Sequence, residues 1–226
     1  MSENELDQRE QKVVWVKEKL EEIYEPPERE QGATPLETLI RTILSQNTND
    51  KNRDRAWAGL REKFPHFREL EKAPTEEIAR AIAPGGLQNQ KARTIKGVLT
   101  QLKEDRGELR LDFLGDMSLK EALEKLTQFK GVGKKTAGIV LLFSLDKPYF
   151  PVDTHVGRVT TRLGLVKNGE DHHDLLNQVV PNRFKYQLHL HLIRHGREIC
   201  HARGPECSNC ALLSRCPHGQ SRESEQ

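Results

Sequence analysis

Residues 129–137 read Phe-Lys-Gly-Val-Gly-Lys-Lys-Thr-Ala, and this stretch decides how the neighbouring segments fold. Its two glycines, Gly131 and Gly133, are separated by one residue, and helical patterns precede and follow them. Because glycine adopts left-handed backbone conformations without strain, the pair permits a tight turn between two helices. Amide groups at the start of the second helix would then face outward and could bind a phosphate. An ordinary helix–helix turn explains the same glycines, but Lys134 and Lys135 follow directly and favour an anion site.

The segments on both sides of this turn have the apolar spacing of amphipathic helices. Thr34 with Glu37, and Ser118 with Glu121, form capping boxes that predict two helix starts. Apolar stripes predict further helices within 92–102 and 184–199. No segment alternates apolar and polar residues with enough β-branched content to predict a strand. We therefore expect an all-α protein of about ten short helices.

The composition is that of a well-charged globular chain without a membrane span. Of its 226 residues, 31% are charged and 35% are hydrophobic, and 36 basic residues against 34 acidic ones give a net charge of +2. The longest apolar run, 139–143, is far shorter than the roughly 18 residues of a membrane span. Residues 1–10 are too acidic for a signal peptide. We expect an intracellular, cytoplasmic protein, nucleoid-associated in a bacterium, without a membrane partner.

The near-neutral total hides a charge asymmetry. Residues 1–30 hold ten acidic and five basic residues, whereas residues 127–167 hold seven basic and two acidic ones. The basic stretch could face a polyanion. A solvated surface explains the same counts, so charge alone does not identify a partner.

All four cysteines of the chain lie within seventeen residues, at Cys200, Cys207, Cys210 and Cys216. In an intracellular chain such clustering indicates a metal site rather than two disulfides. Four thiolates suit zinc, although zinc sites usually pair two CxxC knuckles and this chain has one. Four thiolates also hold a [4Fe-4S] cluster, and the spacing alone does not choose between the two metals.

A carboxylate follows the hairpin at Asp153, eighteen residues after Lys135. It is placed to cap the next predicted helix, which would be a purely structural role. It could also point back toward the hairpin, where a lysine and a carboxylate together suit Schiff-base chemistry. The amine must be neutral to attack, and the carboxylate would stabilise the cationic sugar that develops as a base departs.

His191 and His195 are four residues apart and could chelate a metal on one helix face. No helical glutamate accompanies them as in a zinc protease. We therefore expect packing or solvent exposure to explain both histidines.

Three segments together resemble the endonuclease III family of DNA glycosylases. They are FKGVGKKTAGIVLL at 129–142, FPVDTHVGRVTTRLG at 150–164 and HGREICHARGPECSNCALLSRC at 195–216. The similarity extends from about Thr34 to Cys216. It implies the helix-hairpin-helix DNA glycosylase fold, with a six-helix barrel domain at 30–147, an iron-sulfur domain at 1–29 and 148–218, and the active-site cleft between them. The polar tail 219–226 is expected to be disordered.

The resemblance also implies roles for single residues. Lys135 is the nucleophile and Asp153 its partner, and the four cysteines match the family's [4Fe-4S] pattern. The expected DNA contacts are backbone phosphate held by the N–H groups of Gly131, Val132 and Gly133, with Lys134, Leu87, Gln46, Asn47 and Arg203. Leu87 takes the place of the wedge residue that enters the base stack.

Two positions depart from the family pattern. The residue that fills the gap left by an extruded base is a glutamine in the family. Here that position is Asn47, and a glutamine stands one place earlier, at Gln46. Arg203 has Gly204 and Glu206 nearby, where the family often has several basic residues.

The resulting hypothesis is a bifunctional DNA glycosylase and abasic-site lyase of base excision repair. It would act as a monomer on double-stranded DNA, remove oxidised pyrimidines through a lysine Schiff base, and nick the strand by β-elimination. A monofunctional, water-using glycosylase, such as a mismatch glycosylase, is the first alternative, although such enzymes usually lack the lysine. A non-catalytic DNA-binding module with a structural metal is the second.

Overall fold

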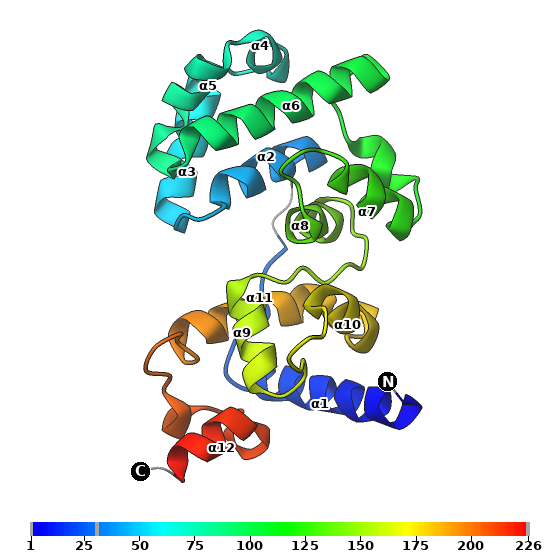
Figure 1. The fold of residues 1–226 in the computed structure, drawn as a ribbon, viewed down its shortest axis with the longest axis vertical. Helices are drawn as coiled ribbons and strands as arrows, with labels where there is room; N and C mark the ends of the chain where they lie inside the picture. Colours follow the sequence, from blue (N-terminus) through cyan, green and yellow to red (C-terminus); the bar gives the residue numbers. More distant parts are fainter. Residues whose placement is uncertain (1, 30–31, 225–226) are drawn as a thin grey trace. The chain divides into compact units, whose positions relative to one another are not determined.

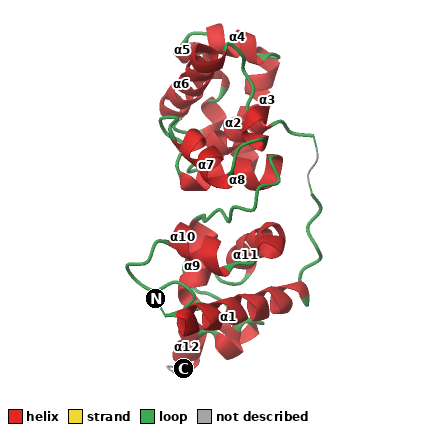
Figure 2. Ribbon diagram, turned by 90° about the vertical axis from the view of Figure 1, so that its right-hand side faces the viewer, coloured by secondary structure: helices red, strands yellow, loops and turns green. Residues whose placement is uncertain are grey.

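The computed structural model describes residues 2–29 and 32–224, and in these ranges it contains helices and loops but no strand (Figure 2). The prediction of an all-α protein is therefore confirmed. The chain divides into two compact units. Unit 1 comprises Met1–Arg29 and Pro148–Gln226, and unit 2 comprises Glu30–Lys147. Among the described residues, no helix is both long and apolar enough to cross a membrane.

Unit 2 is a bundle in which α2 and α8 pack against each other, and α3, α6 and α7 pack around this pair (Figure 1). Its elements are α2 (Pro35–Ser45), α3 (Asp50–Lys63), α4 (Phe67–Lys72), α5 (Thr75–Ala81), η1 (Ala83–Gly85), α6 (Gln88–Arg106), η2 (Asp112–Gly115), α7 (Leu119–Thr127) and α8 (Lys134–Ser144). Both predicted capping boxes are present, at the starts of α2 and α7. Local capping signals thus place two of these helix starts correctly.

The core of unit 2 follows the predicted apolar stripes. Leu39, Ile40 and Ile43 of α2 are buried, and so are Val140 and Leu141 of α8. Each such side chain contributes about 1.5–3 kcal/mol when it leaves water. The α2–α8 contact therefore anchors the hairpin that precedes α8.

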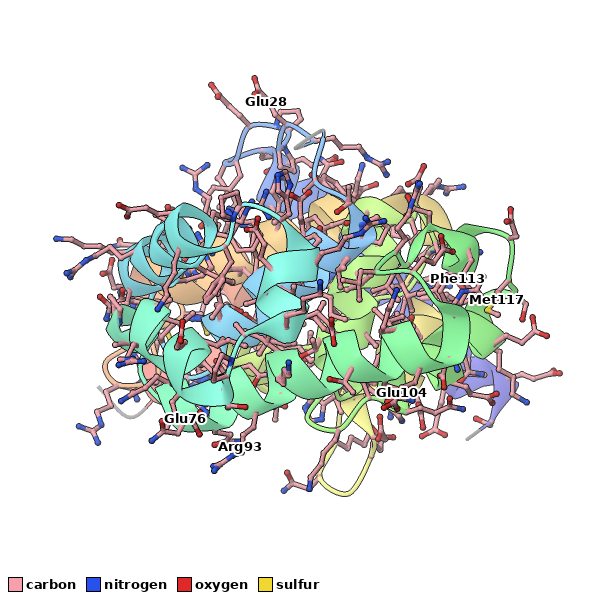
Figure 3. All side chains as sticks on the ribbon, turned by 90° about the horizontal axis from the view of Figure 1, so that it is seen from above. Glu28, Glu76, Arg93, Glu104, Phe113 and Met117 are labelled. Carbon is pink, nitrogen blue, oxygen red and sulfur yellow. The ribbon has the colours of Figure 1, made fainter. Side chains whose placement is uncertain are left out.

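The two faces of α6 differ in polarity. Its apolar stripe, predicted within 92–102, is buried, whereas the side chains of Arg93 and Glu104 extend outward into solvent (Figure 3). Lys91 is the exception, because this charged residue lies on the buried face.

Unit 1 packs α1 (Glu3–Glu21) against α10 (His172–Val179) and α11 (Lys185–Glu198), and α9 (Thr154–Arg162) against α11 (Figure 1). The chain continues through η4 (Cys207–Asn209), η5 (Leu213–Arg215) and α12 (Pro217–Glu223), and η3 (Asn182–Phe184) precedes α11. Buried Arg9 of α1 donates to the Leu165 carbonyl at 3.1 Å and to both Glu170 carboxylate oxygens at 2.8 and 2.9 Å. This arginine ties α1 to the loop before α10.

His191 and His195 lie on the buried face of α11. The Tyr24 ring packs against both, with centroid distances of 5.7 and 6.3 Å. Burial lowers the pKa of His195 to about 4. The expectation that packing accounts for these histidines is confirmed.

Buried Lys185 binds the backbone at Pro148, where the second chain segment of unit 1 begins. The Lys185 ammonium donates to the Pro148 carbonyl at 2.8 Å and to the Asn177 carbonyl at 3.1 Å. Burial lowers the pKa of Lys185 from 10.5 to about 8. The folded state thus binds fewer protons than the unfolded state between pH 8 and 10.5, so stability rises with pH in this window.

From pH 8 to 9.5, we expect the free energy of unfolding of the wild type to increase by roughly 2 kcal/mol relative to that of a Lys185→Met variant. Below pH 8 the cost of burying the charged ammonium is present in full, and above 10.5 it is gone. Urea unfolding of both proteins at several pH values measures this difference. A difference that stays constant, or that shrinks as the pH rises, would contradict the assignment.

The C-terminal segment differs from the expectation of disorder from Gly219 onward, because α12 covers Pro217–Glu223. Pro217 occupies the first turn, where its missing N–H costs nothing, and the Gln220 amide donates to the Cys216 carbonyl at 3.0 Å. A Cβ on Gly219 would lie 2.8 Å from the Leu213 side chain, so the helix packs closely on η5. These tertiary contacts order a polar segment. Residues 225 and 226 of the expected tail lie outside the described residues.

Candidate functional site

The hairpin between α7 and α8 is a tight turn closed by one backbone hydrogen bond. The Val132 amide donates to the Phe129 carbonyl at 3.0 Å, and Gly131 takes a left-handed φ of +87°. Val132 was expected to bind phosphate through its N–H, but the structure engages that amide inside the turn and buries the side chain. Gly131 and Gly133 remain the amides expected to face a phosphate.

Lys134 and Lys135 form the first turn of α8, and both side chains are half-buried. Gly133 precedes them as the N-cap residue and supplies no side-chain hydrogen bond to the helix. Since the first amides of a helix have no intrahelical acceptor, this N-terminus suits an anion. The two lysines add positive charge at the same place.

Gly131 lies directly against Thr94 of α6. A Cβ added at Gly131 would be 2.7 Å from the Thr94 Oγ1 atom and 3.0 Å from its Cγ2 atom. The position therefore requires glycine for two reasons, the positive φ and the close approach.

We expect Gly131→Ala to raise the dissociation constant for duplex DNA by about tenfold or more, because the hairpin must shift away from α6. Gly133→Ala is the matched control, since its φ is −98° and an added Cβ meets no atom within 4 Å. Its loss of affinity should be smaller. Titration of fluorescent duplex DNA measures both, and equal losses would show that the Thr94 contact does not set the hairpin position.

The turn after α2 reaches the same hairpin. The Gln46 amide group donates to the Gly131 carbonyl at 3.4 Å and to the Thr136 hydroxyl at 3.3 Å. Asn47, the next residue, is exposed and takes a left-handed φ of +50°. Gln46 thus supports the hairpin, whereas Asn47 is the residue that faces solvent.

Leu87 combines two unfavourable features. Its side chain is 49% exposed, and its backbone has a left-handed φ of +48°. A bulky residue in this conformation is strained, and such strain persists mainly at functional positions. The structure therefore presents an exposed apolar side chain on a strained turn, and the expected wedge role of Leu87 stays a prediction.

These turns belong to one end of unit 2. Gln46 joins the α2 turn to the hairpin, and Thr94 joins α6 to the hairpin. The Lys91 ammonium joins the α2 turn to the turn that carries Leu87. Sequence reasoning missed Lys91 and Thr94. The burial of Lys91 could have been predicted, because its helical spacing from Ile95, Val98 and Leu102 places it on the apolar stripe.

In unit 1, Asp153 is the N-cap residue of α9. Its Oδ1 atom accepts a hydrogen bond from the Val156 amide at 2.8 Å, and the side chain is half-buried. The capping role considered for Asp153 is therefore confirmed. Lys135 belongs to unit 2, so the expected pairing of the two side chains stays a prediction.

The four cysteines line one pocket, and no disulfide links them. The Arg162 guanidinium donates to the Cys200 Sγ atom at 3.2 Å, and the His195 Nε2 atom lies 3.5 Å from the Cys210 Sγ atom. Burial raises the pKa of Cys210 to about 11 and also raises that of Cys216, and the neighbouring thiols add to both shifts. Metal binding requires the thiolate form, so a bound cation would oppose the effect of burial at Cys210 and Cys216.

The cysteines are the residues of this segment that could hold a metal or a cluster. All four line one pocket, and thiolates are ligands both of zinc and of iron-sulfur clusters.

Two arginines of α9 hold the backbone of the cysteine segment. Arg158 donates to the Cys200 carbonyl at 2.8 Å, and Arg162 donates to the His201 and Ala202 carbonyls at 2.7 and 3.1 Å. These arginines were not predicted, although their spacing of four places them on one helix face. Arg203 lies in the same segment and is exposed.

Comparison with known proteins places this arrangement among DNA repair proteins. Residues 40–181 match the HhH-GPD superfamily of base excision DNA repair proteins. A candidate DNA glycosylase of Arabidopsis thaliana is 39% identical over 178 residues, which are 77% of this chain and 58% of the relative. Endonuclease III of Thermotoga maritima is 34% identical over 192 residues, 84% of this chain and 86% of the relative. The solved structure of a non-covalent endonuclease III–DNA complex superposes with a TM-score of 0.80 at 27% identity, covering 95% of this chain and 98% of the other.

Proposed function

The chain belongs to the HhH-GPD superfamily of base excision DNA repair proteins and is an endonuclease III-like DNA glycosylase, and we propose that it is bifunctional. In this proposal it acts as a monomer, removes oxidised pyrimidines from duplex DNA, and nicks the strand at the resulting abasic site. One observation carries the proposal. Lys135 lies in the first turn of α8, directly after a hairpin whose amides suit a DNA phosphate.

The proposed reaction uses the Lys135 amine as a nucleophile. Its Nζ atom forms a bond to C1′ of the damaged nucleotide while the bond from C1′ to the base breaks, and the base leaves with the electron pair and takes up a proton. The nitrogen lone pair then forms a double bond to C1′ while the bond from C1′ to the ring oxygen breaks, and that oxygen takes up a proton, which gives a Schiff base. A proton leaves C2′ and the bond from C3′ to its phosphate oxygen breaks, which nicks the strand.

Asp153 has the complementary role in this proposal. The sugar becomes cationic as the base departs, and a fixed carboxylate stabilises that charge in the transition state. The N-cap hydrogen bond from the Val156 amide orients the Asp153 carboxylate. Capping and charge stabilisation are therefore compatible in one side chain.

The turns of unit 2 would extract the base. A base within a duplex is unreachable, so the enzyme must unstack it at a cost of a few kcal/mol. We propose that Leu87 enters the stack as a wedge and that Asn47 occupies the gap, because both are exposed on turns at the same end of unit 2. Gln46 is assigned to supporting the hairpin instead.

The cysteine pocket is proposed to hold a [4Fe-4S] cluster with a structural role. When bound, the cluster would fix the segment that Arg158 and Arg162 already hold against α9. Since α9 begins after Asp153, this segment supports the helix that the proposed carboxylate caps.

We expect about four iron atoms per purified chain and a brown colour. Cys210→Ser should remove most of the iron and lower the melting temperature, whereas Ser208→Ala, an exposed change in the same segment, should alter neither. Iron and zinc analysis by mass spectrometry with thermal unfolding measures both. A colourless protein that contains one zinc per chain would overturn the cluster assignment.

Borohydride trapping tests the proposed function. The purified protein is mixed with a duplex that contains one oxidised pyrimidine, and the reductant converts a Schiff base to a stable bond. A covalent protein–DNA band is expected. Release of free base without a band would indicate a water-using glycosylase, and binding with neither product would indicate a non-catalytic module.

A further inference from the structure

Lys91 is a charged residue inside the core of unit 2. Its side chain is 2% exposed, and its Nζ atom donates to the Leu44 carbonyl at 2.7 Å and to the Gly85 carbonyl at 2.8 Å. Burial lowers the pKa of this ammonium. A buried charge is costly, and an apolar residue of similar volume usually packs at least as well. The lysine therefore needs a reason other than filling the core.

The two carbonyls explain why a donor is needed here. Leu44 is in the last turn of α2, where carbonyls lack intrahelical partners, and a cation at this end is also favoured by the helix dipole. Gly85 ends η1, and its missing side chain allows the close approach of Ala56 beside the lysine. A Cβ at Gly85 would lie 3.0 Å from the Ala56 Cβ atom and 3.8 Å from the Lys91 Nζ atom.

Each carbonyl lies just before a strained turn. Asn47 follows Leu44 by three residues and has a φ of +50°, and Leu87 follows Gly85 by two residues and has a φ of +48°. Strained backbone of this kind persists only where the surroundings hold it. One ammonium thus holds the starts of both turns at a fixed separation.

We propose that Lys91 is a positioning residue for base extrusion, which sets the separation between Leu87, the wedge, and Asn47, the gap filler. The proposal rests on the proposed function, because only an enzyme that opens a base stack needs both residues at a defined spacing. Lys91 itself does not touch the DNA. It acts through the two carbonyls, and its removal leaves two buried acceptors without their donor.

The test compares Lys91→Met with Lys96→Met. Methionine keeps most of the volume of lysine but has no donor and no charge. Lys96 is the matched control, since it lies on the same helix and donates to the backbone carbonyl of Glu71. Lys91→Met loses one charge and two lysine–carbonyl bonds, and Lys96→Met loses one charge and one such bond. Thermal unfolding establishes that each protein is folded at the assay temperature.

The main readout is the single-turnover rate of base release from a duplex with one oxidised pyrimidine, at saturating enzyme. We expect Lys91→Met to lower this rate about 10- to 100-fold, the size of effect that a misplacement of about 1 Å can have. Nicking of a preformed abasic site should fall much less, because no base has to be extruded there. Lys96→Met should leave both rates near those of the wild type. A Lys91→Met protein that matches the wild type, or that loses both activities equally, overturns the proposal.

A double-mutant cycle with Leu87→Ala excludes a merely structural role. If Lys91 acts through the wedge, Lys91→Met should have little further effect on base release once Leu87 is truncated. Additive effects would overturn the proposal. If Lys91→Met does not fold, Lys91→Gln, which keeps an amide donor, replaces it in the double-mutant cycle. A small further effect on base release in the Leu87→Ala background would again support the proposal, and additive effects would overturn it.

Borohydride trapping by the wild type separates this inference from the proposed function. If the wild type neither traps DNA nor releases base, the proposed function is wrong, and the inference that rests on it is wrong too. A wild type that traps and releases base, together with a Lys91→Met protein equally competent in both, overturns the inference alone.

Discussion

A Lys135→Gln protein is expected to form no covalent complex with damaged duplex DNA on borohydride reduction. Glutamine keeps a polar side chain of similar reach in the first turn of α8 but has no amine to attack C1′. Base release should fall by about 10³-fold or more, because loss of the nucleophile removes the covalent route and leaves only binding and orientation. Gel analysis of trapped complexes and single-turnover base release measure the two effects.

Lys130→Gln is the control for charge. Lys130 is exposed on the same hairpin, so this change removes one positive charge near the DNA and leaves the Lys135 amine in place. It should weaken binding modestly and more at low salt than at high salt, while trapping persists at saturating protein. A Lys135→Gln protein that still forms the trapped complex would show that another amine is the nucleophile.

The second large effect is expected at Asp153, where two substitutions separate two roles. Asparagine is as good an N-cap residue as aspartate, so Asp153→Asn should keep the hydrogen bond from the Val156 amide and the stability of α9. It removes the charge that would stabilise the cationic sugar. Base release should therefore fall by about 10²- to 10³-fold with little change in melting temperature.

Asp153→Ala should show both losses, in chemistry and in stability. Removal of a cap typically costs about 1 kcal/mol, which thermal unfolding can detect. If Asp153→Asn releases base at the wild-type rate and only Asp153→Ala is impaired, then Asp153 is a capping residue alone. The carboxylate of the reaction would then have to come from another side chain.

The helices and their starts could be read from the sequence because their signals are local. A capping box such as Thr34 with Glu37 joins residues three apart, and an apolar stripe repeats every three or four residues. The glycine hairpin and the cysteine cluster are equally local. For this reason the all-α class, the turn before α8 and the grouping of the metal-type ligands were predictable.

Two expectations failed where a specific contact, rather than residue type or average composition, decides the local structure. The Val132 amide was expected to face a phosphate, but it closes the turn with Phe129. The polar segment after Gly219 was expected to be disordered, but close packing on Leu213 orders it as α12. Composition reports the average solubility of a segment and contains no information about the partner that the fold brings to it.

The sequence by itself determined which residue types were available for chemistry and which short turns would carry them. It placed Lys135 at the start of a helix, Asp153 at an N-cap and four cysteines on one segment. Only the tertiary structure decided what holds those turns in place, as when Lys91 reaches carbonyls six and 47 residues away. The physical reason is that a buried donor takes whichever acceptor packing brings near, and packing is set by the whole core rather than by neighbours in sequence.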